Sequence, residues 1–270
     1  MQFNHDELSS PEWLNDEYFR HVLCKLECDS NVRLIDACVL RPGTKAGDHF
    51  ASVMYRTTLQ YYCTANVKKT INLIMKIKPD TDGFKKDLLD GDDFFGKEIR
   101  MYTEVLPQMA ALMRSIGEEY QYPKLVFASH EPHTIIILED VSSQGWTMEG
   151  LIKSFSELEP TIDAIAKFHA ASVVLQEKSG GKIVDTIFVD YQMCSWCSPV
   201  VDLYYLTYMI PEQSVKNAHR DEIIYRYHQK FASLLRRLNY RGRVPTLTEL
   251  QVELLRKAEL GKWEKWQDMT

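Results

Sequence analysis

The sequence lacks any apolar run that approaches the roughly 20 residues needed to span a bilayer. Its best candidate for a span, residues 198–210, is interrupted by Asp202. A long basic run is also absent, and the net charge of −6 argues against nucleic acid as a partner. Residues 1–13 are polar and acidic, unlike the apolar core of a secretory signal. We therefore expect a cytoplasmic protein that binds neither membranes nor nucleic acid.

Cysteine pairs that could form a metal site are scarce as well. The chain has six cysteines, and in a cytoplasmic protein of this size we expect them to be free thiols. Cys194 and Cys197 have the spacing of half a zinc site, but Cys24 and Cys28 are set one residue wider apart. A zinc site and a redox pair are the alternatives to free thiols at Cys194 and Cys197. Internal repeats and low-complexity tracts are also missing.

The composition that is present is typical of a globular chain, with 45% hydrophobic and 26% charged residues. The 270 residues are enough for one large domain or two lobes. We expect an N-terminal lobe, residues 1–141, with a helix and a five-stranded antiparallel sheet, and a mainly helical C-terminal lobe, residues 142–270. The expected elements in chain order are a helix over 11–28, strands over 32–40, 50–62 and 70–78, a helix over 92–105, strands over 124–129 and 134–139, and a helix over 147–177.

Capping boxes predict where two helices begin. Ser9 and Glu12 form one box before the first helix, and Thr246 and Glu249 form another near the C-terminus. His169 lies on the helix expected over 147–177. A histidine on a helix packs in a core more often than it binds a ligand, so both roles stay open for His169.

A predicted buried strand ends in an acid within residues 183–203, IVDTIFVDYQMCSWCSPVVDL. Its apolar residues lead to Asp190, and a second acid, Asp202, follows inside an apolar run. A carboxylate at the end of a buried strand is a common way to hold a divalent metal against phosphates. The alternative is that Asp190 is an ordinary turn residue.

Three features upstream could also serve phosphate chemistry. The segment RPGTKAGDH contains Gly43 and Gly47, which let backbone amides approach a phosphate, although a plain hairpin loop has the same composition. Lys76 lies in the strand TINLIMKIK and shares a face with Lys78, so strand alternation does not distinguish the two lysines. Glu98 lies in the middle of a predicted helix, where a glutamate is usually solvated.

The order of these features is more informative than any of them alone. A glycine loop between two strands is followed by a lysine on the third strand, a glutamate on the next helix, two more strands, and a helical part with an acid at a strand end. Protein kinases have this order, with the lysine on the phosphates, the glutamate on the lysine and the acid on magnesium. The sequence therefore predicts an α+β, protein-kinase-like fold of two lobes.

Seven segments resemble one family. They are GDHFASVMYR at 47–56, LIMKIKP at 73–79, FFGKEIRMYTEVLP at 94–107, IIILEDVSSQGW at 135–146, IAKFHAAS at 165–172, FVDYQMCSWCSPVVDLYYL at 188–206 and the C-terminal NYRGRVPTLTELQVELL. These segments resemble the ecdysteroid kinase-like proteins of arthropods, which belong with the choline and aminoglycoside phosphotransferases. The resemblance covers most of the chain, and the VDYQ block with the following Asp-Leu is its most specific part.

The resemblance implies roles for particular residues. Lys76 would hold the nucleotide phosphates, Glu98 would pair with Lys76, and Asp190 would bind Mg²⁺ as the metal-binding acid. Gly47 and Asp48 would belong to the loop that covers the nucleotide.

The resemblance also implies the reaction and its ligands. Glu139 to Val141 would surround the adenine of ATP, and Asp202 would brace the catalytic loop. The implied activity is ATP-dependent phosphorylation of a hydroxyl group on a small molecule, such as a steroid, with ATP and Mg²⁺ as cofactors.

The family's His-Gly-Asp catalytic loop is missing from this chain. None of the eight histidines is followed by Gly-Asp, and only twenty residues separate His169 from Asp190. The family holds several tens of residues in this interval, including the catalytic loop, so the C-terminal lobe is expected to be incomplete. We therefore expect phosphate transfer to be impaired. The alternatives to an active kinase are an inactive nucleotide-binding pseudokinase and a non-functional variant from splicing or gene prediction.

Overall fold

The structure is a computed structural model that describes residues 10–43, 52–64, 66–78, 93–147, 150–179 and 198–257. Several residues predicted to have functional roles lie outside these ranges: Gly47, Asp48, Asp190, Cys194 and Cys197.

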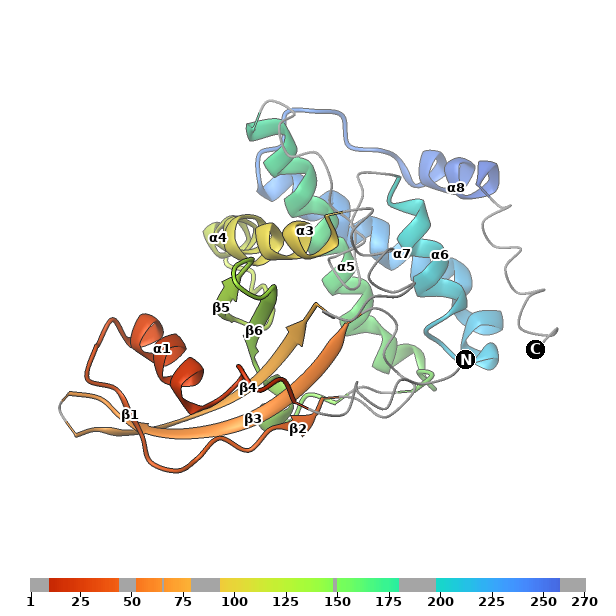
Figure 1. Ribbon diagram of the computed structural model, residues 1–270. Coiled ribbons are helices and arrows are strands. Elements are labelled where there is room, and N and C mark those ends of the chain that lie inside the picture. Colours follow the sequence, from red (N-terminus) through yellow and green to blue (C-terminus); the bar gives the residue numbers. More distant parts are fainter. Residues whose placement is uncertain are drawn as a thin grey trace. The chain divides into compact units, whose positions relative to one another are not determined.

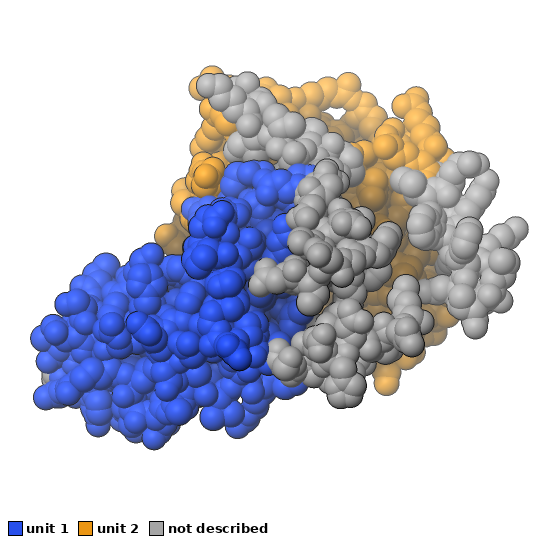
Figure 2. Space-filling view, viewed as in Figure 1, with its two compact units in different colours: residues 1–103, 122–147 blue, residues 104–121, 148–270 orange. Residues whose placement is uncertain are grey.

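The chain divides into two compact units (Figure 2). The first comprises residues 1–103 and 122–147, and the second comprises residues 104–121 and 148–270. These units group residues that contact one another. The predicted lobes were instead defined by the kinase-like order of elements, so the predicted boundary after residue 141 stays a prediction. Within the described ranges, no helix is both long enough and apolar enough to cross a membrane.

The first unit is built on an antiparallel sheet (Figure 1). The two long strands, β3 and β4, pair from Val53 opposite Ile77 to Tyr62 opposite Lys68. β4 then pairs with β6 and β6 with β5, while the short β1 and β2 both pair with β3. The strands are β1 (Arg33–Leu34), β2 (Arg41–Pro42), β3 (Val53–Tyr62), β4 (Lys68–Ile77), β5 (Leu125–Ser129) and β6 (Ile135–Glu139).

Strand alternation gives the sheet two different faces. One face carries alternate apolar residues of three strands and packs in one core with α1 (Asp16–Glu27). The other face carries Lys76, because side chains on successive strand residues point to opposite sides. The strand residues in the α1 core are Tyr55, Leu59, Tyr61, Leu73, Met75, Ile77, Ile135 and Ile137.

The first helix begins at Asp16, so the prediction that it begins near residue 11 is wrong. The side-chain oxygen of Asn15 accepts the N–H groups of Glu17 and Tyr18, which is the usual arrangement of an N-cap. Two acids in the first turn also favour a start here, since they complement the helix dipole. Glu12, half of the predicted capping box, lies in a turn, and Ser9 lies outside the described residues.

The strand predicted over 32–40 is also wrong in extent, because only β1 and β2 at its two ends pair with β3. In between, the N–H of Cys38 donates to Asp16 Oδ1 at 2.7 Å instead of to a neighbouring strand. This hydrogen bond lowers the pKa of Asp16. The chain therefore leaves the sheet to contact the start of α1.

The helix that carries Glu98 continues well past the predicted end at residue 105. α3 (Phe94–Arg100) leads into a π-helical turn, η2 (Met101–Val105), and then into α4 (Leu106–Ser115). Pro107 lies in the first turn of α4, where its missing N–H is not needed. The wider π turn opens the hydrogen-bond ladder just where the proline ring would otherwise clash.

The second unit is helical. α5 packs along α7, and α6 and α8 both contact α7. The helix predicted over 147–177 begins only at Phe155, because Ile152 pairs with the connection before α7 and Ser154 caps the helix. The capping box of Thr246 and Glu249 is confirmed. The helices are α5 (Phe155–Lys178), α6 (Val200–Tyr208), α7 (Gln213–Arg237) and α8 (Leu247–Arg256).

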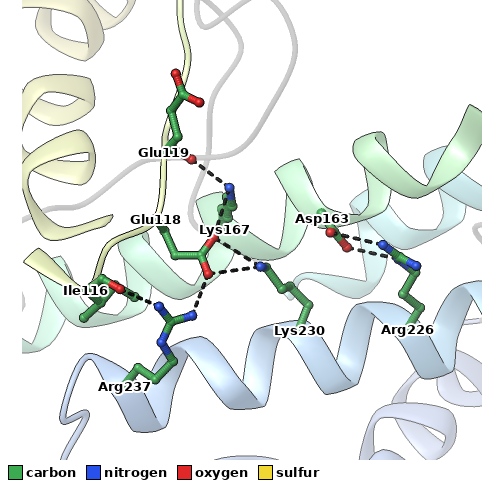
Figure 3. Close-up of polar contacts among 8 residues, drawn as sticks. All are labelled: Ile116, Glu118, Glu119, Asp163, Lys167, Arg226, Lys230 and Arg237. Carbon is green, nitrogen blue, oxygen red and sulfur yellow. Dashed lines mark hydrogen bonds and ion pairs between the residues drawn. The ribbon is translucent and has the colours of Figure 1, made fainter. Parts of the chain in front are cut away.

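A partly buried ionic cluster ties the segment after α4 to α5 and α7 (Figure 3). Glu118 accepts hydrogen bonds or ion pairs from Lys167 at 3.2 Å, Lys230 at 3.2 Å and Arg237 at 2.5 Å. Lys167 also donates to the backbone carbonyl of Glu119, and Arg237 to that of Ile116. The three cations are thus used within the second unit.

Candidate functional site

Lys76 is buried on the face of the sheet opposite α1. It is flanked across the strands by Met54 of β3 and Ile136 of β6, and only 7% of the residue is exposed. An ammonium group so poorly hydrated has to be paired, because an isolated buried charge is very costly. Lys78 is only half-buried and follows the end of β4. The structure thus distinguishes two lysines that strand alternation could not.

Glu98 supplies the partner of Lys76. Lys76 Nζ donates to Glu98 Oε2 at 2.8 Å, and both side chains are less than a tenth exposed. The ring of Phe95, one turn earlier on α3, lies 6.0 Å from the ammonium group. The usual expectation that a mid-helix glutamate is solvated therefore does not hold for Glu98. A lysine held in this way is a positive charge fixed in position on this face of the sheet.

The segment after β6 is held in a defined turn beside the same sheet face. The N–H of Asp140 donates to Asn72 O at 2.9 Å, which extends the pairing of β4 and β6 by one bond. Asp140 then caps a 3₁₀ turn, Val141–Gln144, by accepting the N–H of Ser142 at 3.0 Å. Gln144 donates back to the carboxylate of Glu139 at 2.9 Å. Glu139 and Val141, predicted to surround adenine, are therefore ordered by this turn.

Arg56 of β3 reaches this turn from the other side of β4. Its Nη1 lies 2.9 Å from Ser142 Oγ and 3.4 Å from Asp140 Oδ2. Because Arg56 pairs with Ile74, and Ile74 lies two residues before Lys76, both basic side chains are on one face of the sheet. Sequence reasoning did not single out Arg56, since an arginine in a strand usually lies in solvent.

The predicted metal site cannot be assembled from the described residues. Asp190 lies outside them, as do Gly47 and Asp48 of the glycine loop. Across the described ranges, no group of three or more His, Cys, Asp or Glu side chains is arranged to hold a metal ion. Of the residues predicted to contact a nucleotide, the structure describes Lys76, Glu98 and the segment from Glu139 to Val141.

Asp202 and His169 lie together in the second unit with Tyr227. His169 Nδ1 is 2.8 Å from the Tyr227 hydroxyl, and His169 Nε2 is 2.9 Å from Asp202 Oδ2. Burial and the nearby Asp202 charge raise the pKa of Tyr227 well above its ordinary value, so its hydroxyl stays protonated. Both ring nitrogens of His169 are thus in hydrogen bonds, one with the Tyr227 hydroxyl and one with the Asp202 carboxylate. His169 is thus a core residue within this network.

A tripeptide that matches the catalytic loop of protein kinases does not replace the missing acid. His219, Arg220 and Asp221 spell the His-Arg-Asp signature, but they lie within α7. Asp221 is exposed, and His219 pairs with Glu222 on the same helix at 2.8 Å. A helical surface does not present an aspartate as a loop does, so this match is coincidental.

The sheet with its buried lysine–glutamate pair, and the helical unit, define an α+β protein with a kinase-like fold. Residues 46–183 and 177–240 match the ecdysteroid kinase-like family. Since these segments span more than half of the sequence, the chain belongs to the ecdysteroid kinase-like family. The two segments meet at residues 177–183, where the sequence predicts missing residues. No individual curated protein matches the chain at a significant level.

Proposed function

We propose that this chain binds Mg·ATP as a member of a family of small-molecule kinases but transfers phosphate poorly. The observation that carries the proposal is the buried ion pair of Lys76 and Glu98 at 2.8 Å. In kinases the equivalent lysine contacts the α- and β-phosphates, and its glutamate partner holds it in place. The family assignment supports this role independently.

Each residue of the proposed site has a separate task. Lys76 attracts and orients the phosphates, and Glu98 keeps the ammonium group from turning away. Backbone groups of Glu139 to Val141 hold the base, because the turn capped by Asp140 fixes their direction. Asp190 is the residue proposed to hold Mg²⁺, which would neutralise phosphate charge when bound. Gly47 and Asp48 are proposed to cover the nucleotide.

The proposed substrate is a small molecule with a hydroxyl group, such as a steroid. Transfer to that hydroxyl needs an acid–base residue that orients it, and the family's His-Gly-Asp loop is absent. Loss of such a group alone slows a reaction by about 10²- to 10⁴-fold. A nucleotide-binding pseudokinase is therefore the second candidate, and a non-functional variant the third. We infer a cytoplasmic location, where ATP and magnesium are both available.

Thermal denaturation with and without Mg·ATP tests nucleotide binding. A ligand that binds only the native state raises the melting temperature, by an amount set by its concentration and dissociation constant. We expect a reproducible increase with millimolar Mg·ATP. Lys76→Ala should abolish that increase, because it removes the charge that contacts the phosphates.

Lys78→Ala is the matched control, since Lys78 lies on the same sheet face but is half-buried and follows the end of β4. This variant should keep the full Mg·ATP response. An equal response in wild type and Lys76→Ala would contradict the proposed site. No response in wild type at saturating Mg·ATP would favour the non-functional variant.

A further inference from the structure

Arg56 is placed where an arginine does little for the stability of the sheet. It lies directly opposite Arg41 of β2, and like charges in facing positions destabilise a strand pair. Its Nε is buried and has no hydrogen-bond partner among the described residues. A buried N–H without a partner carries a further cost, and such groups need an explanation.

The contacts that Arg56 does make are directed at one short segment. Its Nη1 contacts Ser142 and Asp140, so the side chain spans β4 to reach the turn after β6. The Asp140 side chain is 11% exposed and that of Arg56 is 39% exposed. An ion pair with one half-exposed partner and a separation of 3.4 Å contributes only modest stability. The pair fixes the turn after β6 relative to β3.

Arg56 is not well placed to contact phosphates itself. Its cross-strand row, with Ile74 and Leu138, lies two residues along each strand from the row of Lys76 and Ile136. Two residues of a strand span about 7 Å. The guanidinium is also turned towards Asp140. Arg56 therefore contacts the segment that is proposed to hold the base.

We propose that Arg56 is a positioning residue for the nucleobase. By holding Asp140 and Ser142, it keeps the backbone of Glu139 to Val141 in the direction that binds the base edge. This inference rests on the proposed function, because it assumes that a nucleotide binds on the Lys76 face. It predicts that Arg56 affects the base and not the phosphates.

Three ligands separate these two effects in titration calorimetry: Mg·ATP, adenosine and Mg·tripolyphosphate, which has no base. Arg56→Met should weaken Mg·ATP at least tenfold and weaken adenosine comparably, while tripolyphosphate changes less than twofold. Arg56→Lys should recover part of the ATP affinity, because it keeps a cation for Asp140. Asp140→Asn should reproduce the selective loss, since its oxygen can still cap the N–H of Ser142.

Arg41→Met is the matched control. Arg41 is the cross-strand partner of Arg56, and its side chain has no hydrogen bond or ion pair with a described residue. It should bind all three ligands within twofold of wild type. Equal losses of ATP and tripolyphosphate affinity in Arg56→Met would overturn the inference. So would wild-type ATP affinity in both Arg56→Lys and Asp140→Asn, which covers the case in which Arg56→Met does not fold.

These outcomes are distinct from a failure of the proposed function. If no nucleotide site exists at Lys76, Lys76→Ala will bind both ATP and tripolyphosphate as wild type does. If the site exists and Arg56 has no role in it, Lys76→Ala will lose both ligands and Arg56→Met will lose neither. Selective loss of base-containing ligands in Arg56→Met alone supports the inference.

Discussion

The Glu118 carboxylate contributes to stability in a pH-dependent way, because three cations surround it. Burial on its own would raise the pKa of Glu118 above its usual 4.5, but hydrogen bonds from Arg237, Lys167 and Lys230 outweigh burial and lower the pKa to about 2. Between pH 4.5 and about 2, the Glu118 carboxylate is therefore ionised in the folded state but protonated in the unfolded state. The stability it provides is fully present above pH 4.5 and is lost as the pH falls towards about 2.

Glu118→Gln should therefore remove part of the acid sensitivity of this protein. At pH 7 we expect a loss on the order of 2 kcal/mol in the free energy of unfolding, since three cations lose their shared anion. At pH 3 the loss should be smaller, because wild type has already given up part of this stabilisation. Urea denaturation at both pH values measures the two losses.

Glu253→Gln is a suitable comparison, because among the described residues the Glu253 carboxylate pairs only with Arg256, at 3.9 Å and largely exposed to solvent. Its substitution should change stability by less than about 0.5 kcal/mol at either pH. A pH-independent loss in Glu118→Gln would mean that Glu118 acts through packing and not through its charge.

At the scale of single residues, the sequence identified Lys76 and Glu98 by their order along the chain, and the buried pair is present. Strand alternation alone could not choose between Lys76 and Lys78, because both lie on one strand face, and the choice of Lys76 came from the family resemblance. In the structure, burial and the ion pair with Glu98 distinguish Lys76 from the half-buried Lys78. Arg56 was missed for a similar reason: its partners, Asp140 and Ser142, are more than eighty residues away along the chain.

At the scale of elements, local capping signals located the start of α8 but missed the starts of α1 and α5, which Asn15 and Ser154 cap. Thr246 and Glu249 form the predicted box, each accepting a backbone N–H of the other. The strand predicted over 32–40 failed because its alternating pattern does not reveal that Cys38 bonds to Asp16. The helix predicted to end at residue 105 continues, because a π turn before Pro107 accommodates the proline.

Thr246→Ala should loosen the first turn of α8. It removes the side-chain oxygen that accepts the N–H of Glu249, and such N-cap losses cost about 1 kcal/mol. Hydrogen exchange of the amides of residues 248–250 should become several-fold faster. Thr248→Ala makes the same chemical change at an exposed position two residues later and should leave that exchange nearly unaltered. Equal effects of the two substitutions would argue against a capping role.

At the scale of the whole molecule, the α+β class and the kinase-like fold followed from the order of strands, helices and candidate residues along the chain. The extents of the short strands did not, because tertiary contacts decide them. The metal-binding role of Asp190 and the covering role of Gly47 and Asp48 stay predictions from the family resemblance, since these residues lie outside the described ranges.

This chain should bind Mg·ATP without phosphorylating a steroid substrate. Incubated with Mg·ATP and a polyhydroxylated steroid, it should form no phosphorylated steroid above the level of Lys76→Ala, as judged by mass spectrometry. Mg·ATP should nevertheless raise the melting temperature of wild type. The reason is that the residues proposed to bind phosphate are present in the sequence, whereas the family's hydroxyl-orienting acid is missing. Robust product formation would mean that another residue replaces that acid.

The register of β3 and β4 limits how the length of this hairpin can change. A substitution within Lys68–Ile77 alters one side chain, but a single inserted or deleted residue reverses the face of every residue beyond it. Lys76 would then turn into the α1 core, and Met75 would face Glu98. Deletion of a single residue from this hairpin should therefore disrupt the proposed nucleotide site, even at positions where substitutions are tolerated.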